Sequence, residues 1–171
     1  MKRIYIILII SILIVILGIT IYILNENNKN EEKILAVNFN TSELVKSIIE
    51  NEYISKDMNI NSMQNITELE INSIYNIDNN LLNQFSGLIP MINLSADEIL
   101  IVEVKNINDI EEIKIKFKEK SEHIAKKFEN YLQKEYLLAS NPLIYSKGKY
   151  VIFAISDNNN EIKSIFENEF K

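Results

Sequence analysis

A single histidine and a pair of neighbouring acidic residues are the first candidates for catalysis or metal binding. His123 lies among charged residues in a segment with helical spacing and has no nucleophile motif beside it, so we expect a surface position rather than a catalytic base. Asp97 and Glu98 head an apolar run and could hold a cation. We favour a local role, in which Ser95 and Asp97 hydrogen-bond the backbone of a turn.

A second acidic group has the alternate spacing of a calcium-binding loop, at Asp157, Asn159 and Glu161. The glycine and the later bidentate glutamate of such a loop are missing, so we expect these residues to cap a helix. Tyr131 and Tyr136 flank the end of a long helical segment and could line a surface groove, although packing at the rim of the core is favoured. The sequence thus predicts no catalytic residue, no cofactor site and no metal site.

Sequence motifs of familiar enzyme classes are missing as well. There is no Gly-x-Ser-x-Gly, no His-Glu-x-x-His and no glycine-rich phosphate-binding loop. The chain has no cysteine, which excludes disulfide bonds, thiol catalysis and thiolate metal ligands. We therefore expect a protein that is not an enzyme.

The longest apolar stretch runs from Ile4 to Leu24 and holds no charge. As a helix it is long enough to cross the hydrocarbon core of a bilayer, which is roughly 30 Å thick. Lys2 and Arg3 precede it, and positive charge is kept on the cytoplasmic side. A cleaved signal peptide is the alternative, disfavoured because its apolar region is usually shorter and ends in a small-residue cleavage site. We expect residues 4–24 to be a transmembrane signal anchor in contact with membrane lipid.

The anchor sets the predicted domain organisation. Residues 1–3 are expected in the cytoplasm, residues 25–40 form a polar tether and lead-in, and residues 41–171 form one extracytoplasmic domain. The net charge is −6, and all 24 acidic residues follow Leu24. This acidic balance argues against a nucleic-acid partner, which requires a basic surface.

Hydrophobic spacing predicts a mixed domain. Helical spacing occurs in four segments, which begin near Thr41, Thr67, Asn108 and Ile162, and the third is predicted to run to about Leu132. Four strands are predicted, over residues 85–94, 98–105, 143–146 and 150–156. The second and fourth of these are apolar on both faces, which suits central strands covered on each side. The expected fold is α+β, with a small antiparallel sheet of about four strands packed with one long helix and shorter helices.

Individual residues predict several local features. Thr67 and Glu70 form a capping box, and Asn76 suits a left-handed helix end. Pro90 cannot donate a ladder hydrogen bond, so we expect its strand at a sheet edge or with a bulge there. Gly148, together with the lysine before it, is expected at the turn of the last hairpin.

Three short segments carry a resemblance to a known family: Ser95–Ile99, Phe128–Leu132 and Lys147–Val151. In their order and spacing, and with Ile74–Tyr75 before them, they resemble a bacterial envelope family catalogued as domain of unknown function 4358. The resemblance spans roughly residues 41–170. It implies an extracytoplasmic module tethered to a membrane, and it supplies no catalytic residues.

Three functions stay open at this point. The favoured one is a membrane-anchored, non-catalytic module that binds a protein or a cell-envelope component outside the membrane. The alternative is a sensor for a cation or small ligand that uses Asp97 and Glu98. The third is a carboxylate-based hydrolase of envelope polymers, which requires two carboxylates converging in a deep pocket.

Overall fold

The computed structural model describes residues 12–26 and 38–170, which belong to two separate compact units. In the first unit, residues 12–26 are helical. Within these described ranges, no helix combines the length and the apolar character needed to cross a membrane. Residues 4–11 of the predicted anchor, and residues 27–37 of the predicted tether and lead-in, lie outside the described residues.

The second unit is built on a five-stranded antiparallel sheet with the strand order β1-β2-β3-β5-β4. The strands are β1 Met63–Asn65, β2 Leu82–Pro90, β3 Glu98–Val104, β4 Leu143–Lys147 and β5 Tyr150–Ile155. Every residue of β3 and β5 is buried, which confirms that the two doubly apolar runs form central strands. The α+β prediction is confirmed. The expected count of four strands is wrong, because β1 is too short to show an alternating pattern.

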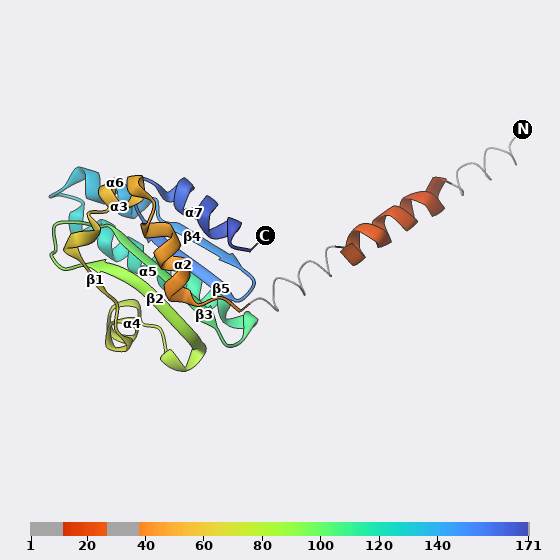
Figure 1. Cartoon of the computed structure of the whole chain (residues 1–171), viewed down its shortest axis with the longest axis horizontal. Coiled ribbons are helices and arrows are strands. Elements are labelled where there is room, and N and C mark those ends of the chain that lie inside the picture. The colour runs from red at the N-terminus through yellow and green to blue at the C-terminus, as the bar shows by residue number, and fades with distance from the viewer. Residues whose placement is uncertain (1–11, 27–37, 171) are drawn as a thin grey trace, which may run out of the picture. The chain divides into compact units, whose positions relative to one another are not determined.

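Helices cover both faces of this sheet (Figure 1). They are α2 Thr41–Ile49, α3 Glu52–Asp57, α4 Glu68–Tyr75, α5 Ile110–Phe128, α6 Gln133–Ser140 and α7 Asn159–Asn168. The buried side chains of α4, α5 and α6 share one core with Leu100 and Phe153. Because side chains alternate along a strand, Ile99 and Ile101 point to the opposite face, where α2 and α7 contact the strands.

The long helix ends earlier than its spacing predicts. Helix α5 stops at Phe128, where the Tyr131 amide donates to the Phe128 carbonyl, and α6 begins at Gln133. The sequence does not reveal α6, because Ala139 is its only buried residue and leaves no apolar stripe. The break places α6 beside α5, and these two helices make the largest helix–helix contact of the domain.

The local predictions for the two ends of α4 are confirmed. The Thr67–Glu70 capping box is present, and Asn76 has a left-handed φ of 53°. Pro90 behaves differently, because it ends β2 opposite Met63 of β1. Strand β2 is therefore not an edge strand, and its register shift lies at Leu82, at the other end of the strand.

The last hairpin is present, with a turn one residue later than predicted. Lys147 pairs with Tyr150, so Gly148 and Lys149 form the turn. Gly148 has a φ of 57°, in the region that favours glycine.

Candidate functional site

Helix α5 has a hollow on each flank. On one side lies a groove of about 460 Å³ between α5, α6 and β4, which we call the α5–α6 groove. On the other side lies a smaller hollow of about 180 Å³ between α5 and the loop from β2 to β3, which we call the Glu98 pocket.

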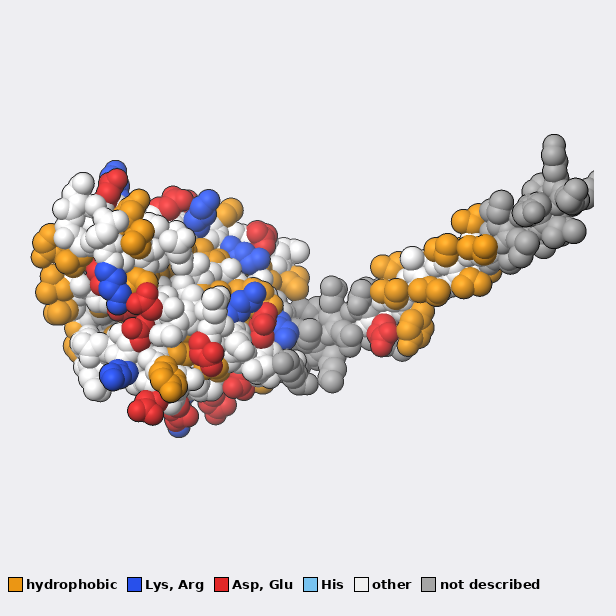
Figure 2. Space-filling view, turned by 90° about the horizontal axis from the view of Figure 1, so that it is seen from above, with side chains coloured by type: hydrophobic (Ala, Val, Ile, Leu, Met, Phe, Trp, Pro, Cys, Tyr) orange, Lys and Arg blue, Asp and Glu red, His pale blue; other side chains and the backbone are white. Residues whose placement is uncertain are grey.

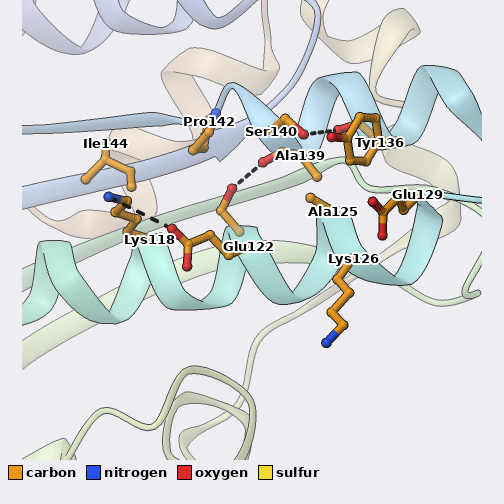
Figure 3. A pocket seen from close by; sticks show the side chains of 11 residues that line it. Lys118, Glu122, Ala125, Lys126, Glu129, Tyr136, Ala139, Ser140, Pro142 and Ile144 are labelled. Carbon is orange, nitrogen blue, oxygen red and sulfur yellow. Dashed lines mark hydrogen bonds and ion pairs between the residues drawn. The ribbon is translucent and has the colours of Figure 1, made fainter.

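The α5–α6 groove has an apolar floor (Figure 3). Ala125 of α5 faces Ala139 and Tyr136 of α6, and Ile144 closes the groove from β4. Ser121 Oγ donates to the carbonyl oxygen of Ala139 and joins the two helices at the base. Small residues on both helices therefore leave room that larger side chains would fill.

Charged side chains of α5 form the rim of this groove. Lys118 pairs with Glu122 at 3.9 Å, and Lys126 and Glu129 continue the rim. A volume of about 460 Å³ falls within the roughly 300–1,000 Å³ of ligand pockets. The groove therefore suits a ligand that places an apolar group on the floor and polar groups against the charged rim.

Strand β4 forms an open edge beside the groove. Among the strands of the described residues it ends the strand order and pairs with β5 alone. In a two-residue hairpin the pair next to the turn is hydrogen-bonded, so every second residue of β4 points its backbone groups away from β5. In this register these residues are Ile144 and Ser146. An extended segment added at this edge would lie along the groove.

The Glu98 pocket contains a buried carboxylate. Glu98 is 5% exposed, accepts a hydrogen bond of 2.8 Å from the Tyr75 hydroxyl, and lies 3.3 Å from Lys120 Nζ. The Lys120 ammonium also lies over the Tyr75 ring, at 5.2 Å from its centre. These three side chains come from β3, α4 and α5, so the pocket forms only when the domain is folded.

Burial shifts the titration of this cluster. It raises the pKa of Glu98 above its usual value, and the charge of Lys120 and the Tyr75 hydrogen bond offset part of that rise. The pKa of Tyr75 is raised by burial and by the neighbouring Glu98 charge. The Glu98 carboxylate is thus buried away from water, and the Lys120 ammonium compensates its charge.

The structure confirms two sequence predictions near this pocket. His123 is exposed on α5 and lines the pocket mouth. Ser95 Oγ accepts a hydrogen bond of 3.1 Å from the backbone N–H of Asp97, as predicted for the turn, whereas the Asp97 carboxylate accepts from Ser95 Oγ at 2.6 Å and not from the backbone. Burial raises the pKa of Asp97 to about 6.

Asp97 and Glu98 do not share a site. Glu98 contacts Tyr75 and Lys120, whereas the Asp97 carboxylate contacts Ser95. Within residues 12–26 and 38–170, no group of three histidine or acidic side chains could hold a metal ion. The paired-acid arrangement of the cation hypothesis is therefore not formed.

The predicted capping role of the second acidic group is wrong. The N-cap of α7 is Asn158, which makes no side-chain capping hydrogen bond. Asp157 instead forms an ion pair with Lys134 at 2.9 Å. The side-chain Nδ2 of Asn159 donates to the backbone carbonyl oxygen of Asn141 at 2.9 Å. Asp157 and Asn159 therefore contact α6 and the residue that follows it, and do not cap the N-terminus of α7.

Tyr131 and Tyr136, the two tyrosines proposed to line a groove, lie in different surroundings. Tyr136 lines the α5–α6 groove, as one of the sequence alternatives proposed, whereas Tyr131 is 68% exposed and does not line it. The groove residues of α5 and β4 are not evident from the sequence, because short apolar residues such as Ala125 carry no chemical signal.

The hydrolase hypothesis needs two converging carboxylates. Glu98 is the one acidic side chain among the described residues that line its pocket. In the groove, Glu122 and Glu129 are exposed and lie about two helical turns apart on the rim. Neither hollow brings two carboxylates together.

Surface composition distinguishes one end of the domain. Figure 2 shows hydrophobic side chains gathered at the left end of the domain in this view, with lysine and acidic side chains interspersed over the rest of the visible face. Exposed apolar residues of the domain include Met91, Ile92 and Leu94, all in the loop that borders the Glu98 pocket. Such exposed apolar groups are typical of contact surfaces.

A family comparison identifies the region that contains both hollows. A family model described as "Domain of unknown function (DUF4358)" matches residues 56–156. No curated protein and no solved structure matches the chain.

Proposed function

We propose that this chain, which belongs to the DUF4358 family, a domain family of unknown function, is a non-catalytic binding module of the cell envelope. Its partner is an extended segment of another envelope protein. One observation carries this proposal, namely the α5–α6 groove beside the open edge of β4.

The groove and the edge supply complementary contacts. The backbone groups of Ile144 and Ser146 can pair with an added strand, which gives affinity without sequence specificity. Alternate side chains of that strand would point toward the floor at Ala125 and Ala139. The charged rim on α5 would then contact polar neighbours, as at the rim of protein interfaces.

Membrane anchoring is part of the proposal. Residues 4–24 hold no charge and follow Lys2 and Arg3, which supports a single span with the N-terminus in the cytoplasm. In that orientation the domain of residues 38–170 faces the cell exterior, where it meets envelope proteins.

Site-specific photo-crosslinking in intact cells tests the binding proposal. A crosslinking amino acid at Tyr136 lies in the groove, and the same amino acid at Tyr131 lies outside it, five residues earlier. We expect a discrete protein adduct from position 136 and a much weaker one from position 131. Charge reversal of the rim by Glu122→Lys with Glu129→Lys should reduce the adduct at position 136 at least severalfold.

A matched control uses Glu112→Lys, which reverses an exposed charge on α5 outside both hollows. It should leave the adduct unchanged. Equal adducts at positions 131 and 136, or no adduct beyond that of the anchor segment alone, would contradict the proposal.

A further inference from the structure

The Glu98 pocket is lined by nitrogen-bearing side chains of α5. Lys120, His123 and Lys127 follow one another at spacings of three and four residues, so they share one face of the helix. The remaining charged group of the lining is Glu98. The nearby Glu119 pairs with Lys116 at 3.5 Å, outside this lining. In a chain with a net charge of −6, this lining is a local excess of positive charge.

The loop opposite α5 adds neutral donors. Lys127 Nζ donates to Asn93 Oδ1 at 2.7 Å, which orients the Asn93 amide nitrogen as a further donor. Ser95 also lines the pocket and is held by its hydrogen bonds with Asp97. The hydrogen-bonding side chains therefore come from both walls.

We propose that the Glu98 pocket binds a small oxyanion group, a carboxylate or a phosphate, with Lys127 and Asn93 as its donors. Charge-assisted hydrogen bonds from lysine to such groups are stronger than neutral ones. The pocket of about 180 Å³ has room for one such group rather than for a large ligand. This site is separate from the α5–α6 groove, on the opposite flank of α5.

The buried carboxylate does not prevent anion binding. Glu98 is compensated by Lys120 and by the Tyr75 hydroxyl, so its charge is largely neutralised before a ligand arrives. Lys127, the other lysine of the lining, forms none of the ion pairs found among the described residues, and its charge acts on Glu98 less than that of Lys120 does.

Apolar side chains form the remaining walls. Ile89, Ile124 and Phe128 line the pocket, and Lys127 lies over the Phe128 ring at 5.6 Å from its centre. Low-dielectric walls strengthen the attraction between an ammonium group and an anion. These walls therefore favour anion binding at Lys127 over binding at a lysine that has no apolar neighbours.

Nuclear magnetic resonance titration of the full chain in a mild detergent tests this site. Sodium phosphate and sodium acetate are added separately, at constant ionic strength maintained with sodium chloride. We expect saturable shifts in the amide signals of residues 93–95 and 120–128 with at least one of the two anions. Saturation with phosphate alone assigns a phosphate ligand, and saturation with acetate alone assigns a carboxylate ligand.

Two variants decide whether the site is specific. Lys127→Gln removes the unpaired cation at an exposed position and should weaken binding about tenfold. Lys56→Gln removes an exposed cation of α3, outside both hollows, and should change affinity less than twofold. Linear, non-saturable shifts with both anions, or equal weakening by the two variants, would overturn the proposal.

Discussion

Glu98 shows how a single buried charge depends on its partners. It lies at the start of β3, while Tyr75 ends α4 and Lys120 lies in the middle of α5. Lys120 has 13% of its side chain exposed, so both members of the ion pair are largely removed from water. Such a pair adds little net stability, but loss of one member leaves the other uncompensated.

Removing Glu98 should therefore be costly. We expect Glu98→Ala to lower the free energy of unfolding by about 3 kcal/mol, because Lys120 and the Tyr75 hydroxyl lose their acceptor. Glu98→Gln keeps an acceptor for Tyr75 and should cost less. Urea denaturation followed by circular dichroism measures both. Glu112→Ala, at an exposed site, should stay within about 0.5 kcal/mol of the parent, and an equal loss in all three variants would refute this role.

Asp97 predicts a pH dependence. Its pKa is about 6 in the folded domain, above the ordinary 3.8, so the folded state binds this proton more tightly than the unfolded state. Its contribution to stability is complete below about pH 4 and is lost as the pH rises through about 6. Asp97→Asn has no carboxyl group at this position, so it should not show this loss of stability with rising pH.

The measurement is urea denaturation of both proteins at pH 4 and pH 7. From pH 4 to pH 7, the free energy of unfolding of the parent should fall by about 1 kcal/mol more than that of Asp97→Asn. This difference is smaller than the full pKa shift would give, because Asp97 is partly exposed. Glu112→Gln should show no such gain. Parallel curves for the parent and Asp97→Asn would show that this carboxyl has an ordinary pKa.

At the scale of elements, Gly87 sets how closely β2 can lie against β3. A Cβ atom at this position would meet the Ile99 carbonyl oxygen and the Leu100 Cα, both backbone atoms of the central strand. Backbone atoms cannot move aside as a flexible side chain can. The absence of a side chain at Gly87 is thus a condition for the β2–β3 pairing.

We expect Gly87→Ala to lower the free energy of unfolding by at least about 2 kcal/mol, because β3 must shift away from β2 to admit the methyl group. Thermal unfolding followed by circular dichroism measures the loss. Ser86→Ala, at the preceding position of the same strand, should cost less than half as much. A Gly87→Ala protein as stable as the parent would show that the two strands have room to adjust.

The elements that could be predicted from the sequence are those with long, regular hydrophobic patterns. The stripe of α5 and the doubly apolar runs of β3 and β5 were predictable because burial imposes a period on many residues. Strand β1 and helix α6 were not, because three residues and one buried alanine carry no period. The α5–α6 groove needs α6, so it was not predictable either.

The Glu98 pocket was missed for a different reason. The sequence marks Glu98 as a candidate, but its partner Tyr75 lies 23 residues before it and its partner Lys120 lies on a later helix. Side-chain contacts over such separations arise from packing of the whole domain. The spacing of Lys120, His123 and Lys127 on one helix face was visible in the sequence and would have been the available signal.

At the scale of the whole molecule, α5 separates two surfaces that differ in chemistry. The α5–α6 groove is apolar with a mixed rim, and the Glu98 pocket is polar with an excess of cations. Both lie within the matched family region, residues 56–156. A module with two such surfaces can hold a protein segment on one flank of α5 and an anionic group on the other, under the two proposals above.

The proposed envelope-binding function assumes a domain that faces the cell exterior. Trypsin added to intact protoplasts should then cleave after Lys29 or Lys33, in the segment between the proposed anchor and the domain. The antibody-detected domain should leave the membrane fraction, because cleavage separates it from residues 4–24. A cytoplasmic protein must stay intact in the same sample, and it should become sensitive once detergent opens the membrane. If the chain stays intact until detergent is added, the domain faces the cytoplasm, and partners must then be sought on that side of the membrane.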